Sequence, residues 1–195
     1  LGQGTIPSYQ KDRGPGISTS MFGTYIQKGE WVIYPFFEYY SDRNFEYKPS
    51  ELGYGLAQDF RGKYRGAEGL IFLGYGLSNR LVLEFEAAAT SASLTKASSD
   101  PSGLPEKLTE SGLGDVQFQL DFRLVGESSR RPEIYAFVEE VIPHHRSRPL
   151  IGTSDWETKA GLGLIRGFSW GTVTVRMAVE HAGGAVGLGE YAVEY

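Results

Sequence analysis

Two glutamates, Glu84 and Glu86, have the residue type and spacing that acid–base chemistry would use. Side chains two residues apart on a strand point to the same side, and a pair of carboxylates is what glycosidic acid–base catalysis requires. No further catalytic motif accompanies the pair. A β-barrel with a polar interior carries such residues on every strand. We therefore interpret both glutamates as interior charges of a β-barrel and expect no catalytic residue.

The adjacent histidines His144 and His145 do not predict a metal site, because neighbouring side chains of an extended chain point apart and no carboxylate lies at a recognised ligand spacing. We expect no metal and no cofactor. The sequence has no G-x-S-x-G turn or other local nucleophile signature, and we predict that the protein is not an enzyme. A Ser–His–Asp triad is assembled by the fold and not by spacing, so a lipid hydrolase or acyltransferase with a histidine base stays open as an alternative class.

The segments that would position these side chains alternate between polar and apolar residues. The clearest is 112–124, where apolar residues from Val116 to Leu124 occupy every second position and polar residues fill the positions between. A helix would distribute the apolar side chains around its circumference, whereas a strand places them all on one face. Segments 80–93, 170–181 and 187–195 alternate in the same way, so we predict an all-β fold.

Eight strands are predicted, each of a length that a tilted strand needs to cross a bilayer. They are 31–40, 64–75, 80–93, 112–124, 131–142, 156–167, 170–181 and 187–195. Two of them are less regular. Pro35 removes a ladder hydrogen bond from the first, and the second places Leu70 and Phe72 on the same face as Glu68.

Residues 1–28 are rich in Gly, Pro, Ser and Gln, which predicts an irregular N-terminal segment before a β-barrel domain at 29–195. Within that domain the predicted connections alternate in length. Long ones at 41–63, 94–111 and 144–155 alternate with short ones at 76–79, 125–130 and 168–169. The last connection, 182–186, is not clearly of either kind. Outer-membrane barrels have short periplasmic turns and longer outward loops, so the alternation predicts a transmembrane barrel with a periplasmic N-terminus.

Composition excludes several other classes of protein. The sequence has no run of ~18 apolar residues that could form a spanning helix. Because only every second residue of a barrel strand faces lipid, the mean hydropathy of −0.27 is no argument for solubility. The chain has no cysteine, so no disulfide framework is available. The net charge is −5 and the Lys and Arg residues are scattered, so the sequence does not predict a basic surface that would bind nucleic acid.

The polar face of the alternating strands is expected to line the interior, or lumen, of the barrel, and the apolar face to contact lipid. The residues expected to face the lumen are Glu84, Glu86, Asp115, Gln117, Gln119, Asp121, Arg123, Lys159 and Arg176. Aromatic residues near strand ends, such as Trp31, Trp156 and Trp170, suit the two interfacial girdles of such a barrel.

Two sequence motifs lie at predicted strand boundaries. They are Gly-Leu-Ser-Asn-Arg-Leu-Val-Leu at 76–83 and Ser-Gly-Leu-Gly-Asp-Val at 111–116. In this pair of motifs the chain resembles the outer-membrane family named for the meta pathway of phenol degradation. The resemblance implies an outer-membrane barrel that takes up small, often aromatic, compounds, and it transfers no catalytic residue. Barrels of this family have more than eight strands, so it also implies a truncated larger barrel, although 189–195 resembles a terminal strand.

These observations predict an antiparallel up-and-down transmembrane β-barrel of the bacterial outer membrane, with about eight strands in this chain. We expect a passive channel or transporter for small, including aromatic, compounds, with membrane lipid and small-molecule solutes as partners and no nucleic acid. One alternative is a small closed barrel with a structural or surface-interaction role, because about eight strands leave an interior filled by side chains. Another is a soluble lipocalin-like binding barrel, because alternation does not say which face is inside and Gly-Glu-Trp at 29–31 is similar to a lipocalin motif.

Overall fold

Most of the chain is extended. The computed structural model describes residues 6–21, 23–144, 147–153, 155–183 and 185–194, the last range by its backbone only. The elements are η1 (Ser8–Gln10), β1 (Ile17–Ser18), β2 (Tyr25–Ile26), β3 (Trp31–Tyr47), β4 (Phe60–Gly76), β5 (Leu81–Thr95), β6 (Lys107–Val125), β7 (Glu133–Ile142), β8 (Glu157–Phe168), β9 (Gly171–Ala182) and β10 (Ala185–Glu194). Within these ranges no helix has the length and apolar character needed to cross a membrane.

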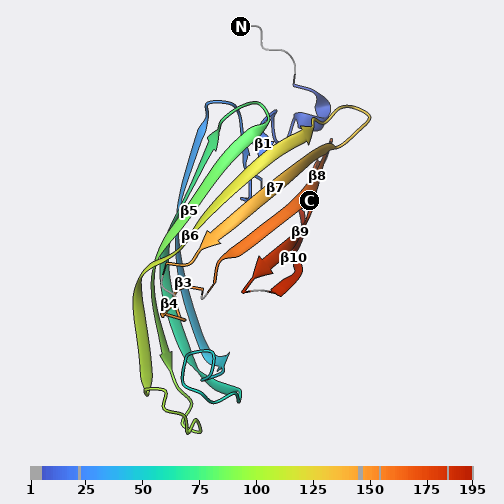
Figure 1. The fold of residues 1–195 in the computed structure, drawn as a ribbon. Helices are drawn as coiled ribbons and strands as arrows, with labels where there is room; N and C mark the ends of the chain where they lie inside the picture. Colours follow the sequence, from blue (N-terminus) through green and yellow to red (C-terminus); the bar gives the residue numbers. More distant parts are fainter. Residues whose placement is uncertain (1–5, 22, 145–146, 154, 184, 195) are drawn as a thin grey trace.

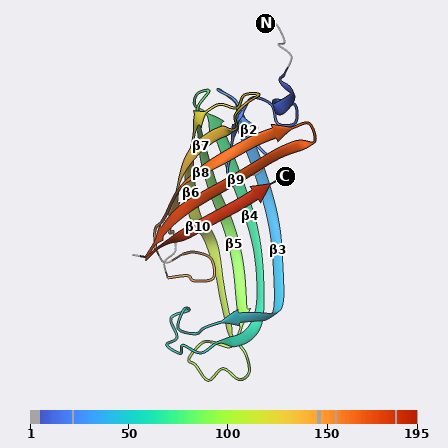
Figure 2. The ribbon, with the colours of Figure 1, turned by 90° about the vertical axis from the view of Figure 1, so that its right-hand side faces the viewer.

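Strands β3 to β10 form one antiparallel sheet in which each strand pairs with its neighbour in sequence. The sheet order is β10-β9-β8-β7-β6-β5-β4-β3, so the chain runs up and down without a crossover, and β3 and β10 are the two edges. The twist of the long strands curls the sheet into a half-barrel with a concave and a convex face, as Figure 1 and Figure 2 show from two sides. The predicted all-β, antiparallel up-and-down architecture is confirmed.

All eight predicted strands overlap the observed strands β3 to β10. Three strands are at least five residues longer than predicted, since β3 and β4 have 17 residues each and β6 has 19. The additional residues lie in stretches such as 41–47 and 107–111, which contain few apolar residues. Pairing with the neighbouring strand, and not the residue pattern, keeps these stretches extended. Pro35 lies in the edge strand β3, where a missing N–H group is tolerated.

The first six connections of the sheet alternate in length as predicted. Those at 48–59, 96–106 and 143–156 are long, and those at 77–80, 126–132 and 169–170 are short. The seventh, at 183–184, is also short. An antiparallel meander places alternate connections at opposite ends of the strands. We call these the short-turn end, at the top of Figure 1, and the long-loop end, where the 48–59 and 96–106 connections reach the bottom and the end of β7 lies higher.

The N-terminal segment, described over residues 6–21 and 23–30, crosses the concave face near the short-turn end (Figure 1). Along the segment, η1 contacts β8, β1 contacts β6 and β2 contacts β4. Strands β1 and β2 pair with each other in a separate two-stranded sheet, and Ile17 and Ile26 are buried against Val82. The segment therefore has little regular structure and is packed against the sheet.

The two faces of the sheet differ in chemistry. On the convex face, one cross-strand row runs over Leu83, Leu120, Val138, Ala160 and Val179, from β5 to β9. Of these, Leu120 and Val138 are 44% and 47% exposed, respectively. The concave face instead carries buried polar side chains, and the apolar face of the sheet points outward.

Candidate functional site

A row of four polar side chains crosses the middle of the concave face. Register places Glu84 of β5 opposite Gln119 of β6, Gln119 opposite Glu139 of β7, and Glu139 opposite Lys159 of β8. Glu84, Gln119 and Glu139 are each at most 3% exposed. Lys159 Nζ lies 3.1 Å from Glu139 Oε1, which neutralises one carboxylate of the row. Alternation positions this row, because each of the four residues is the inward-facing member of its strand.

A cavity of about 460 Å³ lies over this row, between the sheet and the N-terminal segment. Its wall on β3 and β4 is partly apolar, with Phe36, Leu70 and Phe72. Its ionisable lining consists of four carboxylates and two cations, which are Glu38, Glu68, Glu86, Glu139, Lys159 and Arg176. The cavity therefore has an excess of acidic side chains beside an apolar wall.

The acidic side chains of β3, β4 and β5 carry this excess. Glu38 lies directly opposite Glu68 in the register of β3 and β4, and like charges in such positions repel each other. Glu68 accepts a hydrogen bond from Thr90 Oγ1 at 3.0 Å, which is a neutral partner and leaves the charge uncompensated. A cation or a neutral hydrogen-bond donor in the cavity would reduce this repulsion, whereas an anion would increase it.

The N-terminal segment covers the buried end of the polar row. The backbone N–H of Ser20 lies 3.1 Å from each carboxylate oxygen of Glu84, and Ser20 Oγ donates to the same carboxylate. Gln119 Nε2 donates to both oxygens of Asp121, at 2.9 and 3.0 Å. These bonds satisfy carboxylates that burial would otherwise leave without water. Ser20 and Met21 themselves line the cavity.

Most residues predicted to face the lumen lie at or beside this cavity. Glu86, Gln117, Lys159 and Arg176 line it. Glu84, Gln119 and Asp121 lie next to it, buried in the same face. Glu84 and Glu86 share this face, as their spacing predicts, but they have different surroundings, because Ser20 covers Glu84 while Glu86 borders the cavity.

Asp115 does not join the cavity lining. The pairing of β5 with β6 shifts between Ala87 and Ala89, so Asp115 lies at a β-bulge. Its carboxylate accepts hydrogen bonds from the backbone N–H groups of His144 and Thr153, at 3.0 and 2.6 Å. Asp115 thus anchors the 143–156 connection. His144 is exposed in that connection, and His145 lies outside the described residues. In the part of the chain that the structure describes, no three His, Cys, Asp or Glu side chains form a group able to hold a metal ion.

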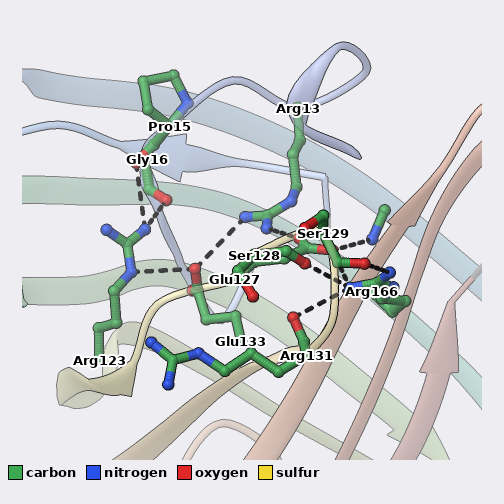
Figure 3. A network of polar contacts seen from close by, with 11 residues as sticks. Arg13, Pro15, Gly16, Arg123, Glu127, Ser128, Ser129, Arg131, Glu133 and Arg166 are labelled. Atoms are coloured by element: carbon green, nitrogen blue, oxygen red, sulfur yellow. Dashed lines mark hydrogen bonds and ion pairs between the residues drawn. The ribbon is translucent and has the colours of Figure 1, made fainter. Parts of the chain in front are cut away.

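A second polar cluster, which we call the charge network, closes the short-turn end (Figure 3). Glu133 Oε2 of β7 lies 3.0 Å from Arg123 Nε of β6 and 3.7 Å from Arg13 Nη1 of the N-terminal segment. Glu127, in the β6–β7 turn, pairs with Arg13 and lies 3.4 Å from Arg166 Nη1 of β8. The side chains of Arg13, Glu127 and Glu133 are at most 1% exposed. Arg123, which was predicted to face the lumen, is a member of this network.

Sequence reasoning did not single out Arg13 or Glu127. Arg13 lies in the irregular segment and Glu127 in a turn, where no alternation marks which side chain is buried. The regular pattern identifies positions on strands, but contacts between a strand and a distant irregular segment leave no local signal.

An apolar cluster, which we call the apolar cap, closes the long-loop end. It consists of Tyr47, Phe60, Leu94 and Leu104, all buried. Tyr47 Oη donates a hydrogen bond to Asp100 Oδ2 at 2.8 Å. Burial alone would raise the pKa of the Asp100 carboxyl, but hydrogen bonds from Ser102 and Tyr47 and the nearby Lys96 ammonium outweigh burial and lower that pKa.

The sequence was also compared with known proteins. No protein-family model matches the chain, and no curated protein matches it significantly. The resemblance of the motifs at 76–83 and 111–116 to an outer-membrane family therefore stays a prediction.

Proposed function

We propose that this chain forms part of the wall of a bacterial outer-membrane β-barrel that lets small cations and neutral compounds, aromatic ones included, pass across the bilayer. The observation that carries the proposal is the contrast between the two faces. The outer face is apolar and exposed, whereas the inner face buries polar side chains such as Glu84 and Gln119 beside aromatic ones such as Tyr135 and Phe137. A soluble binding barrel of lipocalin type has the opposite arrangement. The proposed role is passive and assigns the protein no catalysis.

The extent of the outer apolar surface supports contact with lipid. A second cross-strand row runs parallel to that of Leu120, over Leu81, Phe122, Ala136, Leu162 and Met177. Leu162 and Met177 are 56% and 63% exposed, respectively. Contiguous apolar patches of this kind are rare on soluble monomers and typical of surfaces that meet a membrane or another protein.

Aromatic residues at two heights along the sheet support the same proposal. Near the short-turn end, the rings of Trp31 and Tyr75 lie 4.4 Å apart and those of Phe168 and Trp170 lie 5.0 Å apart. Tyr39 follows Trp31 by eight positions on β3, a rise of ~27 Å along the strand. A strand tilt of ~35–45° reduces this to a height of about 20 Å, close to the ~25 Å apolar band of an outer-membrane barrel.

The proposal requires that the two edges of the sheet find partners. Strands β3 and β10 end the described sheet, and lipid cannot satisfy the backbone N–H and C=O groups of an open edge. Additional strands between these edges would close the barrel and widen it, and barrels with more than about eight strands leave room for an aqueous path.

The lining of the cavity supports the proposed solute class. Four carboxylates against two cations favour cations and neutral compounds over anions. The apolar side chains Phe36, Leu70 and Phe72 give an aromatic ring a surface to contact. A solute with an apolar ring and an amine or hydroxyl group fits both features.

Fractionation and planar-bilayer recording of the full-length protein test the proposal. We expect the protein in a membrane pellet that requires detergent, and a conductance with a reversal potential that shows preference for K⁺ over Cl⁻. A detergent-free monomer would support the soluble barrel instead. A membrane protein without conductance would support the closed structural barrel, and a preference for Cl⁻ would contradict the acidic pathway.

A further inference from the structure

The N-terminal segment is attached to the concave face without joining its sheet. Within the described residues, β1 and β2 pair with each other only, through the pairs Ile17↔Ile26 and Ser18↔Tyr25. Among the residues that the structure describes, backbone hydrogen bonds to the main sheet are confined to the end of the segment, where Gly29 N–H donates to Gly76 O at 2.7 Å and Gly76 N–H donates to Glu30 O at 3.1 Å. The rest of the segment can therefore leave the concave face without breaking the ladder of β3 to β10.

The sheet is shaped to receive this segment. A Cβ atom on Gly167 of β8 would collide with the carbonyl oxygen of Tyr9, and one on Gly76 with the carbonyl oxygen of Gln27. At Gly167 the three atoms nearest to that Cβ all belong to the backbone of Tyr9. Gly167 therefore leaves room for the segment. Its backbone φ is outside the left-handed region, so an alanine is compatible with the strand.

The charge network is balanced without the segment. The sheet and its turn contribute two cations, Arg123 and Arg166, and two carboxylates, Glu127 and Glu133. The segment adds Arg13 as a third cation. If the segment leaves, Arg123 keeps Glu133 and Arg166 keeps Glu127, while Arg13 becomes hydrated. Release thus leaves no carboxylate of the network without a cation.

The segment also borders the candidate pathway. Ser20 and Met21 form part of the cavity wall, and Ser20 covers the carboxylate of Glu84. When the segment leaves, the cavity widens toward the short-turn end, and Glu84 joins its acidic lining. The position of the segment therefore determines both the width and the charge of the pathway.

We propose that the N-terminal segment up to Lys28 is a releasable plug, held in the lumen by Arg13 and by the space above Gly167, and that its release opens the pathway. This inference concerns the regulation of the site and rests on the proposed function. The partner of the plug is the concave face of the same chain.

Two variants are expected to weaken docking of the plug. Arg13→Gln removes its charge, and Gly167→Ala fills the space that Tyr9 occupies. Their matched controls are Lys11→Gln, at an exposed basic residue of the same segment, and Gly69→Ala, at a glycine with open space around it. Heat-modifiable migration on gels verifies that each variant assembles as a barrel.

The first readout follows docking without depending on transport. The chain has no cysteine, so Ser18→Cys introduces a single thiol at a position that is 6% exposed. In this background we expect Arg13→Gln and Gly167→Ala to increase the rate of labelling by a membrane-impermeant maleimide roughly tenfold or more. Arg13→Gln removes one partner of a buried ion pair, and Gly167→Ala collides with the backbone of Tyr9. Both controls should label at the rate of the Ser18→Cys protein itself.

The second readout is conductance of the same full-length variants in potassium chloride. Larger or more frequent openings in both variants, with unchanged controls, support the plug. Faster labelling with an unchanged conductance shows that the segment leaves but does not gate, which overturns the inference alone. Unchanged labelling in both assembled variants shows a fixed structural segment and also overturns it. No conductance in any variant, with labelling increased, overturns the proposed function and the gating role together.

Discussion

At the short-turn end, five charged side chains bind the N-terminal segment to the sheet, whereas at the long-loop end four apolar side chains pack into the apolar cap. Buried ion pairs contribute little net stability, but the loss of one partner is costly. Apolar packing responds instead to lost volume. One end of the half-barrel therefore depends on single charges, and the other on the shape of single side chains.

The largest effect is expected from breaking the charge network at its centre. Glu133 contacts both Arg123 and Arg13, so Glu133→Gln weakens the partner of the buried Arg13 and of the partly buried Arg123 and should lower the free energy of unfolding by ~3–5 kcal/mol. Urea unfolding of the detergent-solubilised protein measures this. Glu106→Gln, at an exposed residue of the 96–106 connection, is the control and should change little. An equal effect of both variants would contradict the importance of the network.

A substitution that removes side-chain volume from the apolar cap tests the long-loop end. Leu94 is fully buried, so Leu94→Ala should lower the free energy of unfolding by ~2–5 kcal/mol. Leu77→Ala, in an exposed turn, is the matched control. In the Ser18→Cys background, maleimide labelling should not change in Leu94→Ala. Faster labelling would mean that the apolar cap affects docking of the N-terminal segment, and would contradict the independence of the two ends.

Between the two ends, the two faces of β6 should respond differently to an added charge. Leu120→Arg places a charge in the proposed lipid-facing band and should cost ~2–4 kcal/mol near the midplane, which impairs membrane assembly. Gln117→Arg places the same charge in the cavity, opposite Glu86, and should assemble normally. The assembled fraction on semi-native gels measures both. If Gln117→Arg proved the more damaging, the assignment of the faces would be reversed.

The smallest effect concerns the polar group within the apolar cap. Asp100 accepts hydrogen bonds from Tyr47 and Ser102, so Asp100→Asn should lower the free energy of unfolding by about 1 kcal/mol at neutral pH. Because the pKa of Asp100 is lowered in the folded protein, its ionised form contributes stability above the unfolded pKa of ~3.9, and this is lost as pH falls through the folded pKa.

Unfolding of wild type and Asp100→Asn at several pH values measures this contribution. The difference between the two proteins should be full at about pH 6 and shrink toward about pH 2. A difference that grows as the pH falls would contradict the direction of the shift.

The sequence determined the strands and their order well. Period-two alternation, as from Val116 to Leu124, and turn residues such as those at 76–79 are local signals, and each predicted strand overlaps an observed one. Alternation also assigned Glu86, Gln117, Lys159 and Arg176 to one face, and these residues do line the same cavity. Strand ends were less predictable, because pairing with a neighbour extends β3 and β6 into stretches with few apolar residues.

Which face of the sheet is concave, and what covers it, follow from the three-dimensional structure and not from the residue pattern. Alternation defines two faces but does not say which of them is concave, so it could not separate an outward-facing, exposed Leu120 from a core leucine. The position of Arg13 beside Glu127 and Glu133 depends on contacts more than 100 residues apart in sequence and on the space above Gly167. Local backbone geometry repeats over two residues and leaves a pattern in the sequence, whereas such long-range contacts depend on the curvature of the whole sheet.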